Sequence, residues 1–163
     1  MLQLTRDGEY AVRAVVYLAT RPEGELCLIS EIAEVQDVPR SYLSKIMQQL
    51  VKAGLVKSRR GAKGGFALAR PAGDITLREA IEAIEGPINL NICLIRPGEC
   101  ERDQTCPIHP VWKEAQARLF EVLDAKTIAS LASDGVRLGK KAAARGAGGP
   151  GRSGPGRKKA AGR

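Results

Sequence analysis

The first third of the chain alternates apolar stripes of helical period with polar breaks. Residues 7–20 gather their apolar side chains on one stripe, which predicts an amphipathic helix. The break at 21–25 contains proline and glycine, and the apolar run at 26–29 predicts a short strand. Ser30 is a good N-cap for a second, short helix. The side chains expected to face inward from that helix are Ile32, Ala33 and Val35.

A third helix is predicted at 40–53, after a turn that ends in Pro39, where a missing N–H costs nothing. One face is apolar, and Gly54 permits a left-handed stop. The other face carries hydroxyl and amide groups, which can bond to base edges and phosphates. Two short helices joined by a tight turn match a helix-turn-helix. The apolar face is Leu43, Ile46, Met47 and Leu50, and the polar face is Ser41, Tyr42, Ser44, Lys45, Gln48 and Gln49.

A basic hairpin is predicted next, with strands at 55–60 and 66–69 and a turn in which Gly64 and Gly65 allow positive φ. Such a hairpin after a polar-faced helix is the wing of a winged helix. Its tip can enter the minor groove, where a narrow, negative channel favours arginine such as Arg60. A phosphate-binding glycine loop is a poorer alternative, because no helix begins after Gly65 to hold the phosphate.

The second half predicts three further helices. Thr76 and Glu79 have the spacing of a capping box, and the helix they begin ends at a Gly-Pro step. Residues 110–123 predict a longer helix, and 127–131 a short capped helix, for which plain coil is the alternative. The apolar stripe of the first is Leu77, Ala80, Ile81 and Ile84, and that of the second is Val111, Trp112, Ala115, Leu119, Val122 and Leu123.

The charge of the chain is concentrated in two places. Of 26 basic residues, nine lie in 135–163 together with no acid, so 1–134 holds 17 basic and 18 acidic residues, a net of −1. That tail has almost no large apolar residue, so we expect it to be disordered and to add only non-specific attraction to nucleic acid. Residues 38–73 hold eight basic residues and no acid. This pattern favours a surface that binds an acidic polymer over a charged surface that only faces water.

Three of the four cysteines and the only histidine fall within seventeen residues: Cys93, Cys100, Cys106 and His109. Thiolate and imidazole select zinc, copper or an iron–sulfur cluster. The gaps of six, five and two residues lack the tight pair with which structural zinc sites usually begin, and they suit a loop around a larger cluster. The alternative to a metal site is a loop whose cysteines have no common function. Cys27 lies apart, and we interpret it as structural or idle.

No long apolar run is present that could serve as a signal peptide or a membrane span. We therefore expect a cytoplasmic protein, in which thiols stay reduced and clustered cysteines bind metals more often than they form disulfides. No Ser/His/Asp or paired-carboxylate arrangement appears, so an enzyme is not expected.

Over roughly residues 1–131 the chain resembles the bacterial winged-helix iron–sulfur regulators of IscR, NsrR and BadM type. The resemblance implies a mainly α fold with a small β-hairpin wing, divided into a DNA-binding domain at 1–73 and a cluster loop with dimerisation helices at 74–134, followed by the tail at 135–163. The motifs that carry it are Met1 to Thr5 with Tyr10-Ala11-Val12, Ser41-Tyr42-Leu43, Gly54-Leu55-Val56, Arg60 to Phe66, and the three cysteines followed by Trp112.

The resemblance also implies the ligands of the cluster. By position, Cys93, Cys100 and Cys106 are three of them. In the IscR type a histidine three residues after the third cysteine completes a 2Fe–2S site, and His109 stands there. In the NsrR type a carboxylate of the partner subunit's first helix completes a 4Fe–4S site, and Glu9 stands there. We favour His109 because it is the only histidine and lies in the loop itself.

The function implied is a homodimeric regulator, most simply a repressor, that binds a pseudo-palindromic operator in double-stranded DNA. Iron supply, oxygen, nitric oxide or redox state would set cluster occupancy and so control iron–sulfur assembly or stress genes. A winged helix with a structural zinc or without metal, and an iron–sulfur electron carrier, are the alternatives. The residues expected at the DNA are Arg40, Ser41, Tyr42, Ser44 and Lys45 on the helix and Arg59, Arg60, Lys63 and Gly64 on the wing.

Overall fold

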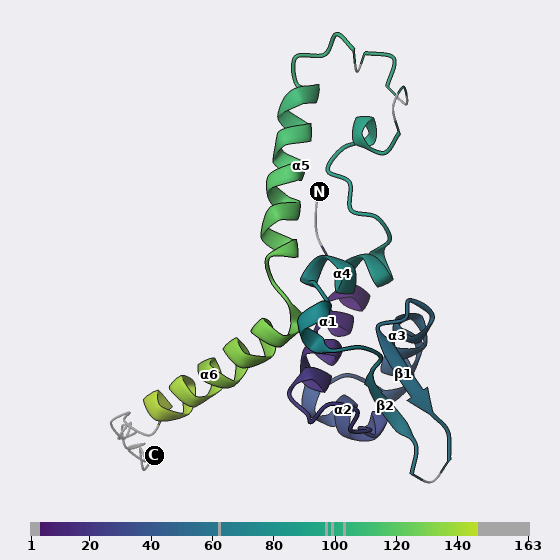
Figure 1. Cartoon of the computed structure of the whole chain (residues 1–163), viewed down its shortest axis with the longest axis vertical. Coiled ribbons are helices and arrows are strands. Elements are labelled where there is room, and N and C mark those ends of the chain that lie inside the picture. Colours follow the sequence, from purple (N-terminus) through teal and green to yellow (C-terminus); the bar gives the residue numbers. More distant parts are fainter. Residues whose placement is uncertain (1–3, 62, 97, 99, 103, 147–163) are drawn as a thin grey trace, which may run out of the picture.

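The computed structural model describes residues 4–61, 63–96, 98, 100–102 and 104–146. Its elements form a helical body, a two-stranded wing and two long helices that leave the body in different directions (Figure 1). In chain order they are α1 (Arg6–Ala19), α2 (Ile29–Gln36), α3 (Arg40–Lys52), β1 (Val56–Arg59), β2 (Gly65–Leu68), the 3-10 turn η1 (Ala72–Asp74), α4 (Leu77–Glu85), the 3-10 turn η2 (Ile92–Leu94), α5 (His109–Asp124) and α6 (Ile128–Gly146).

The core lies where α1, α2 and α3 meet. The apolar stripe predicted on α3 is confirmed, since all four of its large side chains are at most 1% exposed. Gly54 follows α3 with φ 75°, the left-handed stop expected there. Large side chains that fill the core include Val15, Ile32, Leu43, Ile46, Met47, Leu50, Ile75 and Ile128.

The wing is the predicted antiparallel hairpin, in which Val56 pairs with Leu68 and Arg59 with Gly65. The strand expected at 26–29 is reduced to one bridge, in which the backbones of Cys27 and Phe66 exchange two hydrogen bonds of 2.9 Å. Helix α2 then begins at Ile29, so Ser30 is not its N-cap. Val35 was expected to face inward but is 57% exposed, because only Ile32 and Ala33 of this short helix are buried in the core.

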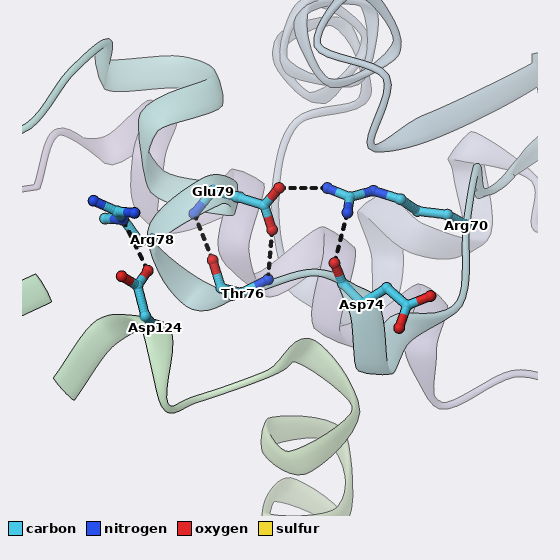
Figure 2. A network of polar contacts seen from close by, with 6 residues as sticks. All are labelled: Arg70, Asp74, Thr76, Arg78, Glu79 and Asp124. Atoms are coloured by element: carbon cyan, nitrogen blue, oxygen red, sulfur yellow. Dashed lines mark hydrogen bonds and ion pairs between the residues drawn. The ribbon is translucent and has the colours of Figure 1, made fainter. Parts of the chain in front are cut away.

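A polar network fastens the wing to α4 and α4 to α5 (Figure 2). The capping box is confirmed: the Thr76 hydroxyl accepts from the Glu79 amide, and the Glu79 carboxylate accepts from the Thr76 amide at 2.9 Å. Arg70, just after the wing, pairs with Glu79 at 2.6 Å and donates to the Asp74 carbonyl oxygen. The second ion pair of the figure, Arg78 with Asp124 at 2.8 Å, joins α4 to the end of α5.

Helices α5 and α6 are the projecting parts of the fold (Figure 1). The helix predicted at 110–123 is confirmed as α5, and none of its sixteen residues, all of them described, is buried. The short helix predicted at 127–131 is longer than expected: α6 runs to Gly146, so the part of the predicted disordered tail at 135–146 is helical. The rest of that tail, 147–163, lies outside the described residues. Within the described chain, no helix combines the length and apolarity that a membrane crossing requires.

Candidate cluster site and DNA-binding surface

The three clustered cysteines and His109 line one pocket of about 170 Å³. Cys93 comes from η2, Cys100 and Cys106 from the segment that follows it, and His109 is the first residue of α5. All three thiols are half-buried and free of disulfides. The remaining wall of the pocket consists of Asn91, Ile92, Ile108 and Trp112.

Local hydrogen bonds explain why the chain returns to this pocket. Before Cys93, the Leu90 amide donates to the Gln116 side chain on α5 at 3.0 Å, and the Asn91 side chain caps η2 by accepting from the Ile92 amide. After it, the His109 amide donates to the Cys106 carbonyl oxygen at 3.2 Å, a turn that puts these two residues side by side. The pocket is thus held between η2 and the start of α5.

The donor set fits an iron–sulfur cluster in chemistry. The pocket collects three thiols and an imidazole whose Nδ1 is buried and, among the described residues, has no hydrogen-bond partner. A buried polar atom without a partner is costly, and a bound metal centre would give this nitrogen a partner. No group of three or more His, Cys, Asp or Glu in the described chain closes tightly enough for one ion, so the donors surround the pocket and do not meet at a point.

Glu9, the alternative fourth ligand, lies elsewhere in the same chain. It is exposed on α1 and lines a second pocket of about 540 Å³, whose other walls are mainly apolar. Those walls are Leu4, Val12, Arg13, Leu77, Ile81 and Leu123. A role for Glu9 at the cysteines therefore requires the partner subunit, as the resemblance implies.

The fourth cysteine, Cys27, is separate from this site, as predicted. Its side chain is 1% exposed in the core beside the wing. Burial raises the pKa of the Cys27 thiol, so it stays protonated and is a poor ligand and nucleophile.

Five of the residues expected at the DNA are exposed cations on α3 and the wing, and in the described chain none of them pairs with a carboxylate. They are Arg40, Lys45, Arg59, Arg60 and Lys63. Ser41 is also exposed, whereas the Ser44 hydroxyl donates to the Arg40 carbonyl oxygen at 2.8 Å. Positive charge without internal partners, spread over a helix and the adjacent hairpin, is the surface expected of a winged helix that binds a duplex.

Comparison with known proteins decides the family. The model of the Rrf2 family, described as "Iron-dependent Transcriptional regulator", matches residues 4–134. The chain belongs to the Rrf2 family. It is therefore a DNA-binding transcriptional regulator and not an enzyme, as the sequence predicted.

Individual relatives agree with this assignment. An HTH-type transcriptional regulator of Aquifex aeolicus (strain VF5) is 35% identical over 124 residues, which cover 75% of this chain and 85% of the relative. The structure of IscR from T. potens is similar with a TM-score of 0.65 and 32% identity, over 82% of this chain and 88% of that one. CymR, the global cysteine regulator of B. subtilis, gives 0.63 and 30%, over 82% and 98%.

Two residues expected at the DNA, Tyr42 and Gly64, also have close contacts inside the chain. The Tyr42 ring is half-buried and packs edge-to-face on Tyr10 of α1, with centroids 5.9 Å apart, and its hydroxyl donates to the Asp7 carboxylate. That hydrogen bond, together with burial, raises the pKa of Tyr42. Gly64 is buried in the tight turn of the wing, where an added Cβ would lie 2.2 Å from the Arg59 carbonyl oxygen.

Sequence reasoning missed the partners that organise both sites. Asp7 was not connected with Tyr42, because the two residues lie 35 positions apart and meet only where α1 crosses α3. Asn91 and Gln116, which hold the segment before Cys93, were also missed. The one local signal was Asn91, two residues before Cys93. Asparagine is a good cap, so it could have indicated the start of the short turn that contains Cys93.

Proposed function

We propose that this Rrf2 regulator is a homodimer that senses iron–sulfur status, redox state or nitric oxide through an iron–sulfur cluster and thereby controls operator binding. Cys93, Cys100 and Cys106 hold the cluster, and His109 completes a 2Fe–2S site in preference to the partner's Glu9 in a 4Fe–4S site. The observation that carries the proposal is the shared pocket, with its three free thiols and the buried, unpartnered Nδ1 of His109.

The residues of the pocket explain how sensing could reach the DNA. A bound iron–sulfur cluster supplies a centre whose integrity depends on iron, oxygen and nitric oxide. Cys93 on η2 and His109 on α5 would be tied to the same group, which orders the segment between them against α5. Because α4 contacts α5 as well as α1 and α3 of the body, a segment ordered against α5 can bias the spacing of two recognition helices in a dimer.

Dimerisation is supported by the surface of α5. Val111 and Val122 are each 63% exposed, and Trp112 is 37% exposed, on a helix that projects from the body (Figure 1). A monomer rarely leaves such a stripe in water, so a second copy of the same helix is the natural cover.

The test is anaerobic purification followed by an absorption spectrum and a count of iron and sulfide. The wild-type protein is expected to be brown with two irons and two sulfides per chain, the content of the 2Fe–2S site favoured here. Cys93→Ala, Cys100→Ala and Cys106→Ala should each lose iron, while Cys27→Ala, the matched control for a thiol outside the pocket, should retain it. Full retention of iron by any of the first three variants would remove that residue from the ligand set.

A second candidate is a cluster-free regulator, in which the 93–109 segment contacts a partner protein. Its support is the similarity to CymR, named as a global cysteine regulator. Colourless protein without iron after anaerobic purification favours this candidate, and zinc in the same sample favours a structural metal. An electron carrier has less support, because it leaves the unpaired cations of α3 and the wing without a role.

A further inference from the structure

The first turn of α1 is joined by polar side chains to α4. The Thr5 amide and the Thr5 hydroxyl both donate to Oε1 of Glu85, at 2.9 and 2.6 Å. The same hydroxyl accepts from the Gly8 amide at 3.3 Å and so caps α1. Glu85 is the last residue of α4, and the chain turns at Gly86 toward the cysteines directly after it. We call the contact of Thr5 with Glu85 the latch.

Gly8 makes the latch possible. A Cβ added at this position would lie 2.2 Å from the Glu85 carboxylate oxygen and 2.9 Å from a Leu4 methyl carbon. Gly8 is buried and stands inside the first turn of a helix, where glycine costs about 1 kcal/mol relative to alanine. A larger residue at position 8 would therefore require the ends of the Glu85 and Leu4 side chains to move.

The same turn of α1 is also joined to the helix-turn-helix. The Asp7 carboxylate accepts a hydrogen bond from the hydroxyl of Tyr42, the third residue of α3, and the Tyr10 ring packs edge-to-face against the Tyr42 ring. One turn later, Arg13 stacks over Tyr10 with 5.6 Å from its guanidinium carbon to the ring centroid, and it bonds to Gln36 at the end of α2. We call the contact of Asp7 with Tyr42 the tether.

The tether leaves Tyr42 unsuited to hold a phosphate. A phosphate oxygen only accepts hydrogen bonds, and the single O–H donor of Tyr42 is given to Asp7. The Asp7 carboxylate would also repel a phosphate brought to the same hydroxyl. Ser41 and Lys45, on either side of Tyr42 along α3, are exposed. A change in the tether would therefore move the exposed side chains of α3 without removing any of them.

We propose that Tyr42 and Asp7 are positioning residues, which set the orientation of the recognition helix, and that the latch carries movement of the cysteine-bearing segment to them. Latch and tether stand within one turn of a single rigid helix, so a shift of Glu85 displaces Asp7 as well. The part that concerns the tether needs only the DNA binding of the family. The part that concerns the latch rests on the proposed cluster function.

The tether is tested by a double-mutant cycle on DNA affinity with Tyr42→Phe, Asp7→Ala and both together. The probe is a fluorescent duplex that the wild-type protein selects from a randomised pool, and affinity is measured by anisotropy on metal-free protein. Each single variant should bind about fivefold more weakly, the factor that corresponds to one ordinary hydrogen bond. The double variant should be no weaker than either single one, because both remove the same contact.

Tyr10→Phe is the matched control, since it removes a hydroxyl from the neighbouring ring of the same cluster and should leave affinity within about twofold. Two outcomes would overturn the tether. Asp7→Ala could bind as tightly as wild type, or the two losses could multiply in the double variant. Either result would make Tyr42 a direct DNA contact that acts independently of Asp7. Equal urea midpoints for all variants exclude a loss of folded protein.

The latch is tested by the ratio of affinities of cluster-loaded and metal-free protein for the same duplex. Glu85→Ala and Gly8→Ala should both bring this ratio toward one while iron content stays that of wild type. An unchanged ratio in both variants would overturn the latch. If cluster-loaded and metal-free wild-type protein bind the duplex equally well, the proposed sensing function and the latch are both wrong. The double-mutant cycle of Tyr42 and Asp7 on metal-free protein still tests the tether in that case.

Discussion

The two cations of the wing tip, Arg60 and Lys63, are expected to act on a duplex in different ways. Both are exposed, and in the described chain neither has a carboxylate partner. An arginine in a narrow minor groove reads width and potential, so Arg60→Ala should cost about 1–3 kcal/mol on the selected duplex and much less on a scrambled one. Lys63→Ala should weaken both duplexes about equally and lower the salt slope by about one unit.

These effects are separated by anisotropy on the selected and scrambled duplexes across a salt series. Arg60→Lys keeps the charge without the planar guanidinium, and Lys126→Ala removes an exposed lysine between α5 and α6 as the control for Lys63. Arg60→Ala with wild-type affinity for the selected duplex at every salt concentration would refute the minor-groove role of Arg60.

His109 and Glu9 are the two candidates for the fourth ligand of the cluster. His109 lines the cysteine pocket within the chain, whereas Glu9 lines a separate pocket on α1. His109→Ala should therefore lose or strongly change the cluster absorption, while Glu9→Ala leaves it as in wild type. Visible circular dichroism of the anaerobic proteins checks this, and the reverse result would assign the partner's carboxylate and a 4Fe–4S site.

The capping box of α4 can be tested at the scale of the element. The pKa of Glu79 lies below its ordinary value (Figure 2). The main cause is the hydrogen bond from the Thr76 amide, and the hydrogen bond and charge of Arg70 lower the pKa further. A depressed carboxyl pKa gives stability that is present above the unfolded pKa of about 4.3 and is lost as pH falls through the folded value. Glu79→Gln should cost about 0.5–1 kcal/mol at pH 7, because the ion pair is partly exposed.

The cost should shrink as pH falls below the unfolded pKa of about 4.3 and disappear only below the depressed folded pKa, where wild-type Glu79 is itself protonated. Urea unfolding of wild type and variant at pH 7 and through this acid range measures it. Glu121→Gln is the control, since Glu121 pairs with Arg118 in an exposed i,i+3 contact whose loss is expected to be nearly silent. A cost for Glu79→Gln that persists unchanged in acid would show that the charge of Glu79 is not what stabilises α4.

Elements with strong local signals were predictable from the sequence. The stripe of α3, its glycine stop and the Thr76 box rest on residues that lie next to one another, so spacing alone identifies them. Helix α6 was underestimated because its residues 135–140 are all exposed and so leave no apolar stripe in the sequence. A helix needs only local hydrogen bonds to continue once its first turn is fixed. The buried side chains of Ile128 and Ala132 fix the start of α6, and Lys140 to Ala144 are good helix formers that extend it.

The candidate site was predictable to a lesser degree. Residue type and spacing were enough to single out the cysteines and His109, because soft ligands in one short segment carry their own signal. The place of Tyr42 was not predictable, because a tyrosine on the polar face of a helix has the same pattern whether it meets DNA or another helix. Its contact with Asp7 depends on the crossing of α1 and α3, which no single segment encodes.

At the scale of the whole molecule, the proposed homodimer would use the exposed face of α5. Leu119 and Leu123 line a pocket with Ile81 of α4, so this side of the helix faces its own chain. Val111 and Val122 are eleven residues apart, close to three full turns, and both are largely exposed. They therefore share a stripe that a second copy of α5 can cover, and a two-fold axis would use each of them twice.

Val122→Glu should therefore separate the dimer into monomers. Burial of one valine contributes about 1.5 kcal/mol and the symmetric pair about 3, so the dissociation constant should rise at least about a hundredfold. Ala117→Glu places the same carboxylate at an exposed position on another side of α5 and should leave the dimer intact. Sedimentation velocity over a concentration series measures the dimer, and a Val122→Glu protein that sediments as wild type would exclude this face. Because a pseudo-palindromic duplex is held by two recognition helices at a fixed spacing, the monomeric variant should also lose the selected duplex more than a scrambled one.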